Sequence, residues 1–192
     1  RTKDGNDATD QGIIKMFGIS KREDKIKALS ELNIVPLSIS YEWETCDYMK
    51  ALELYQSRSE KYVKKQGEDL SSILSGITSF KGDVHLTFCP MITEQDLMAY
   101  DSLPGIEYNR EVAKLMDRRI HAGYRLTPNN FIAHDIRFGK HEFKGDRYTD
   151  EQKDRFLHHL KKLEKYDVDE PEVLMDIFLG IYSNPVDNCL ER

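Results

Sequence analysis

Apolar residues recur at helical spacing over much of the chain, and two shorter segments have the pattern of strands. Apolar positions three and four residues apart predict helices, because they share one face of a 3.6-residue turn. Helices are predicted over residues 11–17, 22–32, 47–65, 69–80, 107–122, 128–136, 149–166 and 171–182, with another opening at Thr93. Strands are predicted over residues 33–41, which are largely apolar, and 83–89, where apolar and polar residues alternate.

Strands that alternate with helical stretches of a dozen or more residues indicate an α/β sheet with crossover helices. From Glu107 onward the pattern is helical throughout. The stretch from Gly139 to Asp146 is polar, charged and glycine-bearing, which is typical of a boundary. The sequence therefore predicts an α/β domain over residues 1–138 and a helical C-terminal extension over residues 139–192.

The two predicted strands carry different signals. In the second, Val84, Leu86 and Phe88 are expected to face one layer of the fold, and the residues between them the other. Pro36 interrupts the first, although proline removes a ladder hydrogen bond and is normally confined to sheet edges, strand starts or bulges. Pro36 is therefore either an edge residue or the point where the strand bends toward a site.

The composition limits the classes of partner. Apolar residues make up 39% and charged residues 32% of the chain, and no apolar run is long enough to span a bilayer. The formal net charge of -6 argues against nucleic-acid binding, which depends on clustered Lys and Arg. Cys46, Cys89 and Cys189 are too widely spaced for a disulfide framework or a zinc site, which favours a reducing compartment.

The first five residues, Arg1-Thr2-Lys3-Asp4-Gly5, place two cations beside a glycine. Such a loop suits a phosphate group, because cationic side chains make charge-assisted hydrogen bonds and glycine permits a tight turn. Taken alone, these residues are more simply interpreted as a solvated tail. Their position ahead of the proline-bearing strand favours a site, whose other half we expect to lie upstream of Arg1.

The loop and the strand resemble two motifs of the glycerol-3-phosphate and lysophosphatidate acyltransferase superfamily. One is a Gly-Arg-Ser-Arg type motif followed by glycine, and residues 1–5 are similar to it when it is cut after its first glycine. Lys3 stands where the family usually has a second arginine, and lysine cannot make the same forked contact. The other is a strand of the form Ile-Pro-Val-x-Ile-x-Tyr-Asp or Tyr-Glu, similar to residues 34–42. Weaker similarity extends to about residue 136.

This resemblance implies the C-terminal part of that family's mixed sheet, and an activity. The activity is transfer of a fatty acyl group from a coenzyme A or acyl-carrier-protein thioester to a hydroxyl of glycerol 3-phosphate or a lysophospholipid, in phospholipid biosynthesis. Arg1, Lys3 and Gly5 would hold the acceptor's phosphate. Pro36, Tyr41 and Glu42 would shape the pocket.

In the family, a His general base and an Asp five residues later precede the basic motif. The resemblance therefore implies no catalytic residue within this chain, which alone should be inactive. It implies no metal, and no cofactor besides the acyl-thioester co-substrate. The alternative function is a non-catalytic module that binds a lipid phosphate or a protein.

The resemblance also implies a cytoplasmic protein, peripheral to the cytoplasmic face of the membrane. Arg58, Lys61, Lys64 and Lys65 of the predicted helix 47–65 could meet an anionic lipid surface, although a solvated helix face is the simpler interpretation. Apolar surface that a missing half would cover could also make the chain self-associate.

Other candidate residues have weaker support. His141 and Asp146 have the family's His-x4-Asp spacing, but they follow the basic motif and lie in a charged stretch, so a hydrolase that uses them is a remote third hypothesis. His158 and His159 are interpreted as surface residues, because adjacent helical positions diverge by about 100° and no third metal ligand is suitably spaced. Cys89 has no obvious basic partner that would activate its thiol.

Overall fold

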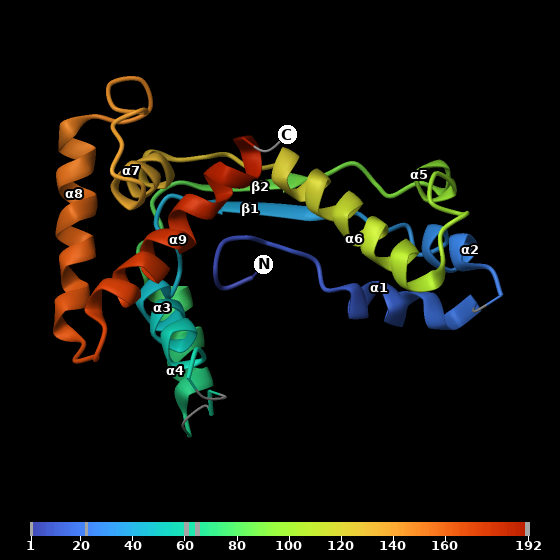
Figure 1. The fold of residues 1–192 in the computed structure, drawn as a ribbon, viewed down its shortest axis with the longest axis horizontal. Coiled ribbons are helices and arrows are strands. Elements are labelled where there is room, and N and C mark those ends of the chain that lie inside the picture. Colours follow the sequence, from blue (N-terminus) through green and yellow to red (C-terminus); the bar gives the residue numbers. More distant parts are fainter. Residues whose placement is uncertain (1, 22, 60–61, 64–65, 191–192) are drawn as a thin grey trace. The chain divides into compact units, whose positions relative to one another are not determined.

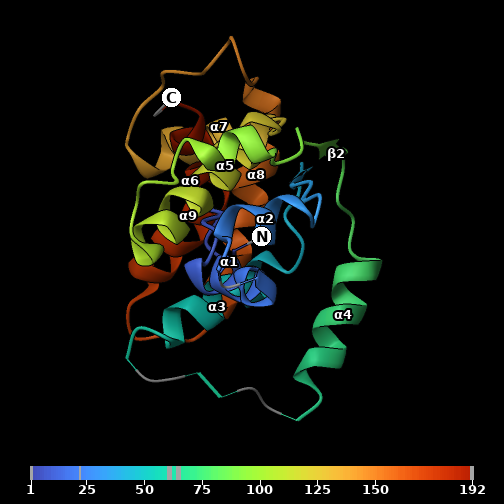
Figure 2. The same cartoon turned by 90° about the vertical axis from the view of Figure 1, so that its right-hand side faces the viewer.

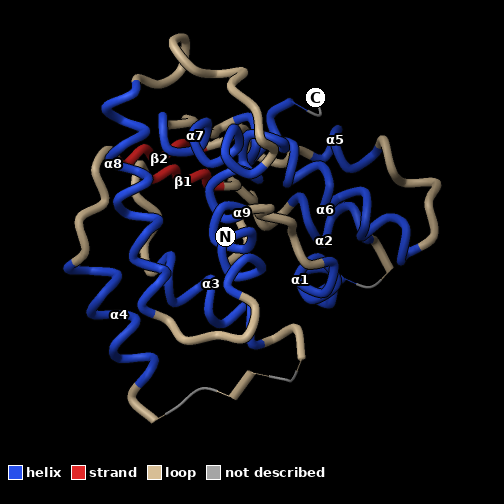
Figure 3. Tube along the Cα trace, turned by 60° about the vertical axis from the view of Figure 1, so that its left-hand side comes forward, coloured by secondary structure: helices blue, strands red, loops and turns tan. Residues whose placement is uncertain are grey.

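The structure is a computed structural model, and it describes residues 2–21, 23–59, 62–63 and 66–190. These residues form a mixed α/β arrangement in which helices predominate (Figures 1 and 3). In chain order the elements are α1 (Gln11–Phe17), the 3₁₀ helix η1 (Gly18–Lys21), α2 (Lys25–Ser30), β1 (Leu37–Tyr41), α3 (Asp47–Gln56), α4 (Glu68–Thr78), β2 (Val84–Phe88), α5 (Glu94–Met98), α6 (Gly105–Ala122), α7 (Pro128–Arg137), α8 (Asp150–Leu160), the 3₁₀ helix η2 (Lys161–Lys165) and α9 (Pro171–Leu190).

The chain folds into two compact units, which do not follow the predicted boundary at residue 138. Unit 1 comprises Arg1–Asn6, Ser40–His85 and Arg125–Arg192, and unit 2 comprises Asp7–Ile39 and Leu86–Tyr124. Residues 139–192 thus belong with α7 in unit 1, because α8 and α9 pack on α7 rather than forming a separate extension.

Unit 1 is built around α9. This helix packs against α7 and α3 and carries much of the core. Its aromatic contacts join segments far apart in sequence: Tyr182 meets Phe156 of α8 edge-on with ring centroids 5.3 Å apart, and Phe178 stacks on Tyr48 of α3 at 5.3 Å. Such pairs add to the free energy gained by burying the rings. The buried core residues are Ala51, Ile132, Ala133, Tyr148, Phe156, Leu160, Leu163, Leu174, Phe178, Leu179, Ile181 and Tyr182.

Unit 2 has its own helical core. In it α1 packs on α6, and α2 packs on α5. Capping is strong at α5, where Thr93 and Asp96 form a reciprocal capping box that satisfies two backbone N–H groups at the helix start. The buried core residues are Ile14, Leu29, Ile92, Leu97, Tyr108, Val112, Ala113 and Met116.

The two strands pair as a small antiparallel sheet. Backbone N–H groups of Glu42 and Cys89 donate to the carbonyl oxygens of Asp83 and Pro36, at 2.8 and 3.0 Å. Two antiparallel neighbours need no parallel crossover, so the predicted crossover arrangement does not describe this pair. Pro36 precedes β1, where its missing N–H leaves no ladder bond unmade.

The alternation predicted for residues 83–89 is present, but its orientation was not anticipated. Val84, Leu86 and Phe88 are exposed, whereas His85 and Thr87 are half-buried. The strand therefore turns its polar side inward, since Thr87 donates a 2.9 Å hydrogen bond to the Gly123 carbonyl. A period-2 pattern fixes which residues share a face, not which face is covered.

Helix α4 also turns its apolar side outward. Its apolar residues Leu70, Ile73, Leu74 and Ile77 are all more than half exposed. The opposite side carries small polar residues and lies toward α3, where Cys46 Sγ donates to the Ser72 carbonyl at 3.4 Å. Figure 2 shows α4 and the segment that leads from it to β2. Within the described residues, no helix is both long and apolar enough to cross a membrane.

Several predicted element ends were wrong. The first strand begins at Leu37, because Asn33 adopts a left-handed backbone conformation with φ 49°. Helix α3 ends at Gln56 rather than continuing to residue 65. Helix α9 continues past Tyr182 to Leu190 although Pro185 lies in its interior and is buried.

Candidate functional site

Side-chain hydrogen bonds order the N-terminal loop into a turn. Asp4 organises it by accepting hydrogen bonds from Thr2 Oγ1 at 2.5 Å, from Asn6 N at 3.1 Å and from Asn6 Nδ2 at 2.8 Å. Partial burial opposes ionisation of Asp4, but these bonds outweigh it and lower the pKa of the carboxyl group. Interpretation of these residues as a solvated tail is therefore wrong for residues 2–6.

Helix α9 holds this loop in place. Asn184 Nδ2 donates to the Asp4 carbonyl at 2.7 Å, and Asn188 Nδ2 donates to the Asn6 carbonyl at 2.9 Å. Gly5 lies buried between them with φ 81°, a conformation that favours glycine. A Cβ at this position would come 2.5 Å from the Ile181 carbonyl oxygen.

Pro185 explains why that carbonyl faces the loop. In an α-helix the Ile181 oxygen would accept from the N–H four residues later, and proline has none. The helix thus leaves a carbonyl without its usual donor at the place where the Gly5 backbone approaches. Loop and helix fit each other only because residue 5 lacks a side chain.

The two predicted cations of the loop have different outcomes. Arg1 lies outside the described residues. Lys3 is partly exposed and its ammonium forms an ion pair with the Glu53 carboxylate of α3. A phosphate bound by Lys3 would therefore compete with an internal carboxylate.

The predicted pocket residues divide between the two units. Pro36 is buried in unit 2. Tyr41 and Glu42 belong to unit 1, but among the described residues Glu42 has no hydrogen bond or ion pair with Lys3. Glu42 instead accepts from Asp83 N at 3.0 Å and borders a 470 Å³ cleft with Arg125 and His85. Glu42 thereby links the residue that follows β1 to the residue that precedes β2.

A larger cavity in unit 1, which we call the Trp43 pocket, was not anticipated. It has a volume of about 650 Å³, within the range of small-molecule sites. The segment after β1, the polar side of α4 and the α8–η2 segment surround it. Its lining residues are Trp43, Glu44, Cys46, Asp47, Tyr48, Met49, Ser75, Ser79, Phe80, Arg155, His158, His159, Lys162, Lys165 and Tyr166.

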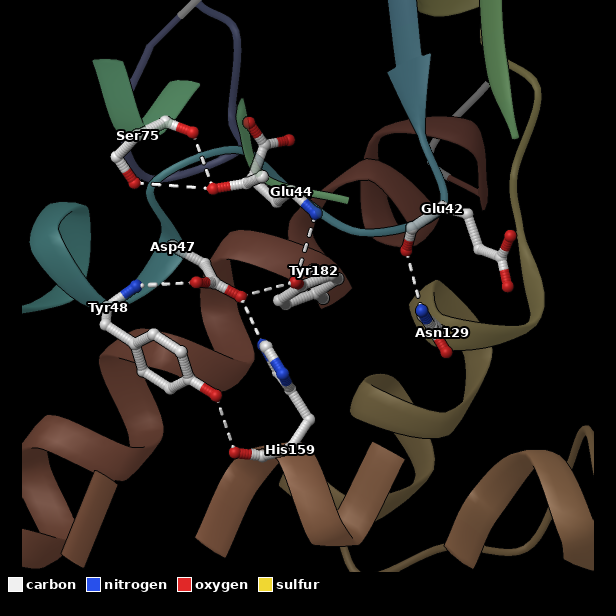
Figure 4. A network of polar contacts seen from close by, with 9 residues as sticks. Glu42, Glu44, Asp47, Tyr48, Ser75, Asn129, His159 and Tyr182 are labelled. Carbon is white, nitrogen blue, oxygen red and sulfur yellow. Dashed lines mark hydrogen bonds and ion pairs between the residues drawn. The ribbon is translucent and has the colours of Figure 1, made fainter. Parts of the chain in front are cut away.

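Asp47, which lines this pocket, is the hub of a hydrogen-bond network (Figure 4). Its carboxylate accepts from Tyr48 N at 2.8 Å and from the Tyr182 hydroxyl at 2.7 Å, and it bonds His159 Nε2 at 2.7 Å. The Tyr182 hydroxyl in turn accepts from Glu44 N at 3.1 Å. The network thereby joins the start of α3 to α8 and α9.

The same network controls protonation of its tyrosines. Burial, together with the Asp47 charge, raises the pKa of Tyr182 well above its ordinary value. Burial also raises the pKa of Tyr48, whose hydroxyl donates to the His159 carbonyl at 2.7 Å. Both groups therefore remain neutral hydrogen-bond donors at physiological pH.

His159 is not the surface residue that was predicted, whereas His158 is exposed. The His159 ring lies between Trp43 and Tyr48, with centroid distances of 4.7 and 4.8 Å. Asp47 fixes the orientation of the ring, and the flanking aromatics restrict access to it. This arrangement fits a role in holding α8 on α3.

Basic side chains also line the pocket. Arg155, His158, Lys162 and Lys165 follow one another at intervals of three or four residues along α8 and η2, which puts them on one side of the segment. Within the described part of the chain, Arg155, Lys162 and Lys165 form no ion pair with a carboxylate. This spacing was visible in the sequence, but the cavity it borders was not.

The remaining candidates from the sequence are His141, Asp146 and Cys89. His141 and Asp146 are exposed, and Asp146 pairs with its neighbour Arg147 at 3.0 Å rather than with the histidine. Cys89 is buried, and this burial raises the pKa of its thiol.

Comparison with known proteins finds no matching family model, no matching curated protein and no matching solved structure.

Proposed function

We propose that this chain forms the acceptor-binding part of a glycerolipid acyltransferase, which moves a fatty acyl group from a thioester to glycerol 3-phosphate or a lysophospholipid. The observation that carries the proposal is the ordered N-terminal loop. In it Gly5 packs on the Ile181 carbonyl and Asp4 accepts the hydrogen bonds that form the turn. A loop backbone held in this way needs little further ordering when a ligand binds Lys3. A non-catalytic module that binds a lipid phosphate is the alternative, and it would use the same loop.

In this proposal Arg1 and Lys3 hold the acceptor's phosphate, and the His–Asp pair that activates its hydroxyl precedes the loop in the full-length protein. Lys3 is released from Glu53 when the phosphate takes over its ammonium group. Such an exchange of one anion for another keeps the cation paired at every stage. Pro36, Tyr41 and Glu42 would contribute to the acyl-binding side of the cleft, and the donor would be a coenzyme A or carrier-protein thioester.

Acyl transfer by the full-length protein provides the test of this role. We expect Lys3→Ala to raise the KM for the acceptor by roughly tenfold or more, because one charge-assisted contact contributes about 1.5–3 kcal/mol. The KM for the thioester should change by less than about twofold. Initial rates of thiol release, measured with each substrate varied in turn, separate the two constants.

Two further variants sharpen this experiment. Glu53→Gln removes the competing carboxylate and should lower the acceptor's KM. Lys140→Ala removes another exposed, ion-paired lysine and should leave both constants unchanged. Equal increases in both KM values for Lys3→Ala would contradict the phosphate-holding role. Residues 1–192 alone should release no thiol above background, and turnover by them would refute an upstream base.

We also propose that the protein acts at a cytoplasmic membrane surface, which the apolar side of α4 contacts. That side is exposed along the helix, with Leu70 and Ile77 exposed to 63% and 70%. A helix that turns its polar side toward its own unit and its apolar side outward resembles an interfacial helix. Self-association through the same side is the competing proposal.

Vesicle co-sedimentation distinguishes these alternatives. The double variant Leu70→Ser/Ile77→Ser should bind phosphatidylcholine vesicles about tenfold more weakly, because each partly buried side chain contributes roughly 1 kcal/mol. The control Ile106→Ser removes an apolar residue of α6 that is even more exposed, at 79%, and should have no effect. Unchanged vesicle binding, with loss of oligomers in analytical ultracentrifugation, would instead support self-association.

A further inference from the structure

We propose that the Trp43 pocket binds a nucleoside phosphate. This site lies wholly within unit 1, and its ligand does not depend on acyl transfer. Basic side chains in the lining, acids that already have internal partners and an exposed aromatic ring point to an anionic ligand that carries a flat ring.

The basic side chains supply the anion-binding groups. Arg155, Lys162 and Lys165 project from one side of α8–η2 into the cavity lining, and the described residues offer none of them a carboxylate partner. Cations left unpaired around one concavity raise the local concentration of anions. Arginine beside lysines is a combination that suits phosphate oxygens, because arginine contacts two oxygens at once and lysine acts as a point charge.

The acidic residues of the pocket are engaged by internal partners rather than by its basic side chains. The Glu44 side chain is 5% exposed and pairs with Lys50 at 2.5 Å. Asp47 is 7% exposed at its side chain and holds three hydrogen bonds, one of them to His159. The pocket therefore combines acids that have internal partners with basic side chains that have no carboxylate partner among the described residues.

The aromatic residues distinguish a nucleotide from a bare phosphate. Lys165 Nζ lies 4.8 Å from the Tyr166 ring centroid and 5.3 Å from that of Tyr48, so one cation sits against rings rather than in bulk water. Phe80 is 81% exposed at the rim and offers a free ring face. Base stacking on such a ring contributes about 1–3 kcal/mol. Ser75 and Ser79 also line the cavity, and the Ser79 hydroxyl, which donates to the Ser75 carbonyl at 2.5 Å, keeps the capacity to accept from a ribose hydroxyl.

Trp43 provides a direct test, because it is the single tryptophan of the sequence and lines the pocket. We expect AMP and adenosine 3′,5′-bisphosphate to change the fluorescence of the chain saturably on excitation at about 295 nm. Adenosine and inorganic phosphate should each bind at least tenfold more weakly than AMP, because each lacks one half of the ligand. Coenzyme A, tested beside AMP, identifies the source: tighter binding of coenzyme A assigns the site to a thioester cofactor, and tighter binding of AMP to a free nucleotide.

Matched variants distinguish binding at this site from non-specific electrostatic attraction of AMP to the protein. Arg155→Ala and Lys162→Ala should each weaken AMP binding by roughly tenfold or more. Lys161→Ala removes the neighbouring lysine, which borders a different cleft, and should leave affinity unchanged. Phe80→Ser should weaken AMP binding but not phosphate binding.

Three results would overturn the proposal: no saturable response to either nucleotide, equal affinities for AMP and inorganic phosphate, or equal effects of Lys161→Ala and Lys162→Ala. Failure of acyl transfer would leave it intact, and failure of nucleotide binding would leave the loop's role in the acceptor site intact.

Discussion

Asp47→Ala is expected to lower the free energy of unfolding of unit 1 by about 3–5 kcal/mol. The substitution removes the one acceptor shared by Tyr182, His159 and the Tyr48 N–H. Tyr182 is 1% exposed, so its hydroxyl cannot turn to water, and a buried donor without a partner forfeits roughly 1–3 kcal/mol. Urea denaturation followed by Trp43 fluorescence measures the effect, because Trp43 belongs to the same unit.

Two variants calibrate this loss. Asp47→Asn keeps one carbonyl oxygen of similar position and should lose about half as much, whereas Asp167→Ala, at an exposed position, should stay within about 0.5 kcal/mol of wild type. A loss below about 1 kcal/mol for Asp47→Ala would mean that water replaces the carboxylate, and that the network does not hold α3, α8 and α9 together.

The Asp47 network also explains what the sequence could not predict about the pocket. Asp47 and His159 are separated by 112 positions, and Asp47 and Tyr182 by 135, so no local spacing signals their contact. The basic residues of the pocket do have local spacing, and they could have been recognised as one side of a helix. Their meaning depends on the cavity, which tertiary packing creates.

Helix positions followed well from periodicity, because spacing and capping act within a few residues. Thr127 followed by Pro128 predicted the start of α7, and the structure confirms a capping box there. Element ends were less predictable where tertiary contacts decide them. Helix α9 passes through Pro185, and α7 stabilises it there, since Asn130 Nδ2 donates to the Tyr182 carbonyl at 2.8 Å and Arg137 to Ser183 Oγ at 3.0 Å.

The direction in which apolar residues point was the weakest part of the prediction. Apolar periodicity in α4 and alternation in β2 both imply a covered apolar side, yet Ile77 and Phe88 are exposed to 70% and 72%. Periodicity is a local property, whereas burial depends on what packs against each element. For the same reason the loop of residues 2–6 could be identified by its chemistry but not placed on α9.

Gly5→Ala is the second change with a large expected effect, a loss of about 2–4 kcal/mol in the stability of unit 1. Two penalties add. A φ of 81° is strained for alanine, and the new Cβ would lie 2.5 Å from the Ile181 carbonyl oxygen. That oxygen cannot easily retreat, because Ile181 is buried in the core of unit 1.

Gly139→Ala isolates the first penalty. Gly139 also has a positive φ, of 63°, but a Cβ there would meet no atom within 4 Å, so we expect a loss of only about 1 kcal/mol. Trp43 fluorescence in urea again reports both variants. Similar losses for the two would show that the loop moves away from α9 freely, which would remove the observation on which phosphate binding by this loop depends. A loss specific to Gly5, beside unchanged stability for Lys3→Ala, would separate the residue that shapes the loop from the one that holds the ligand.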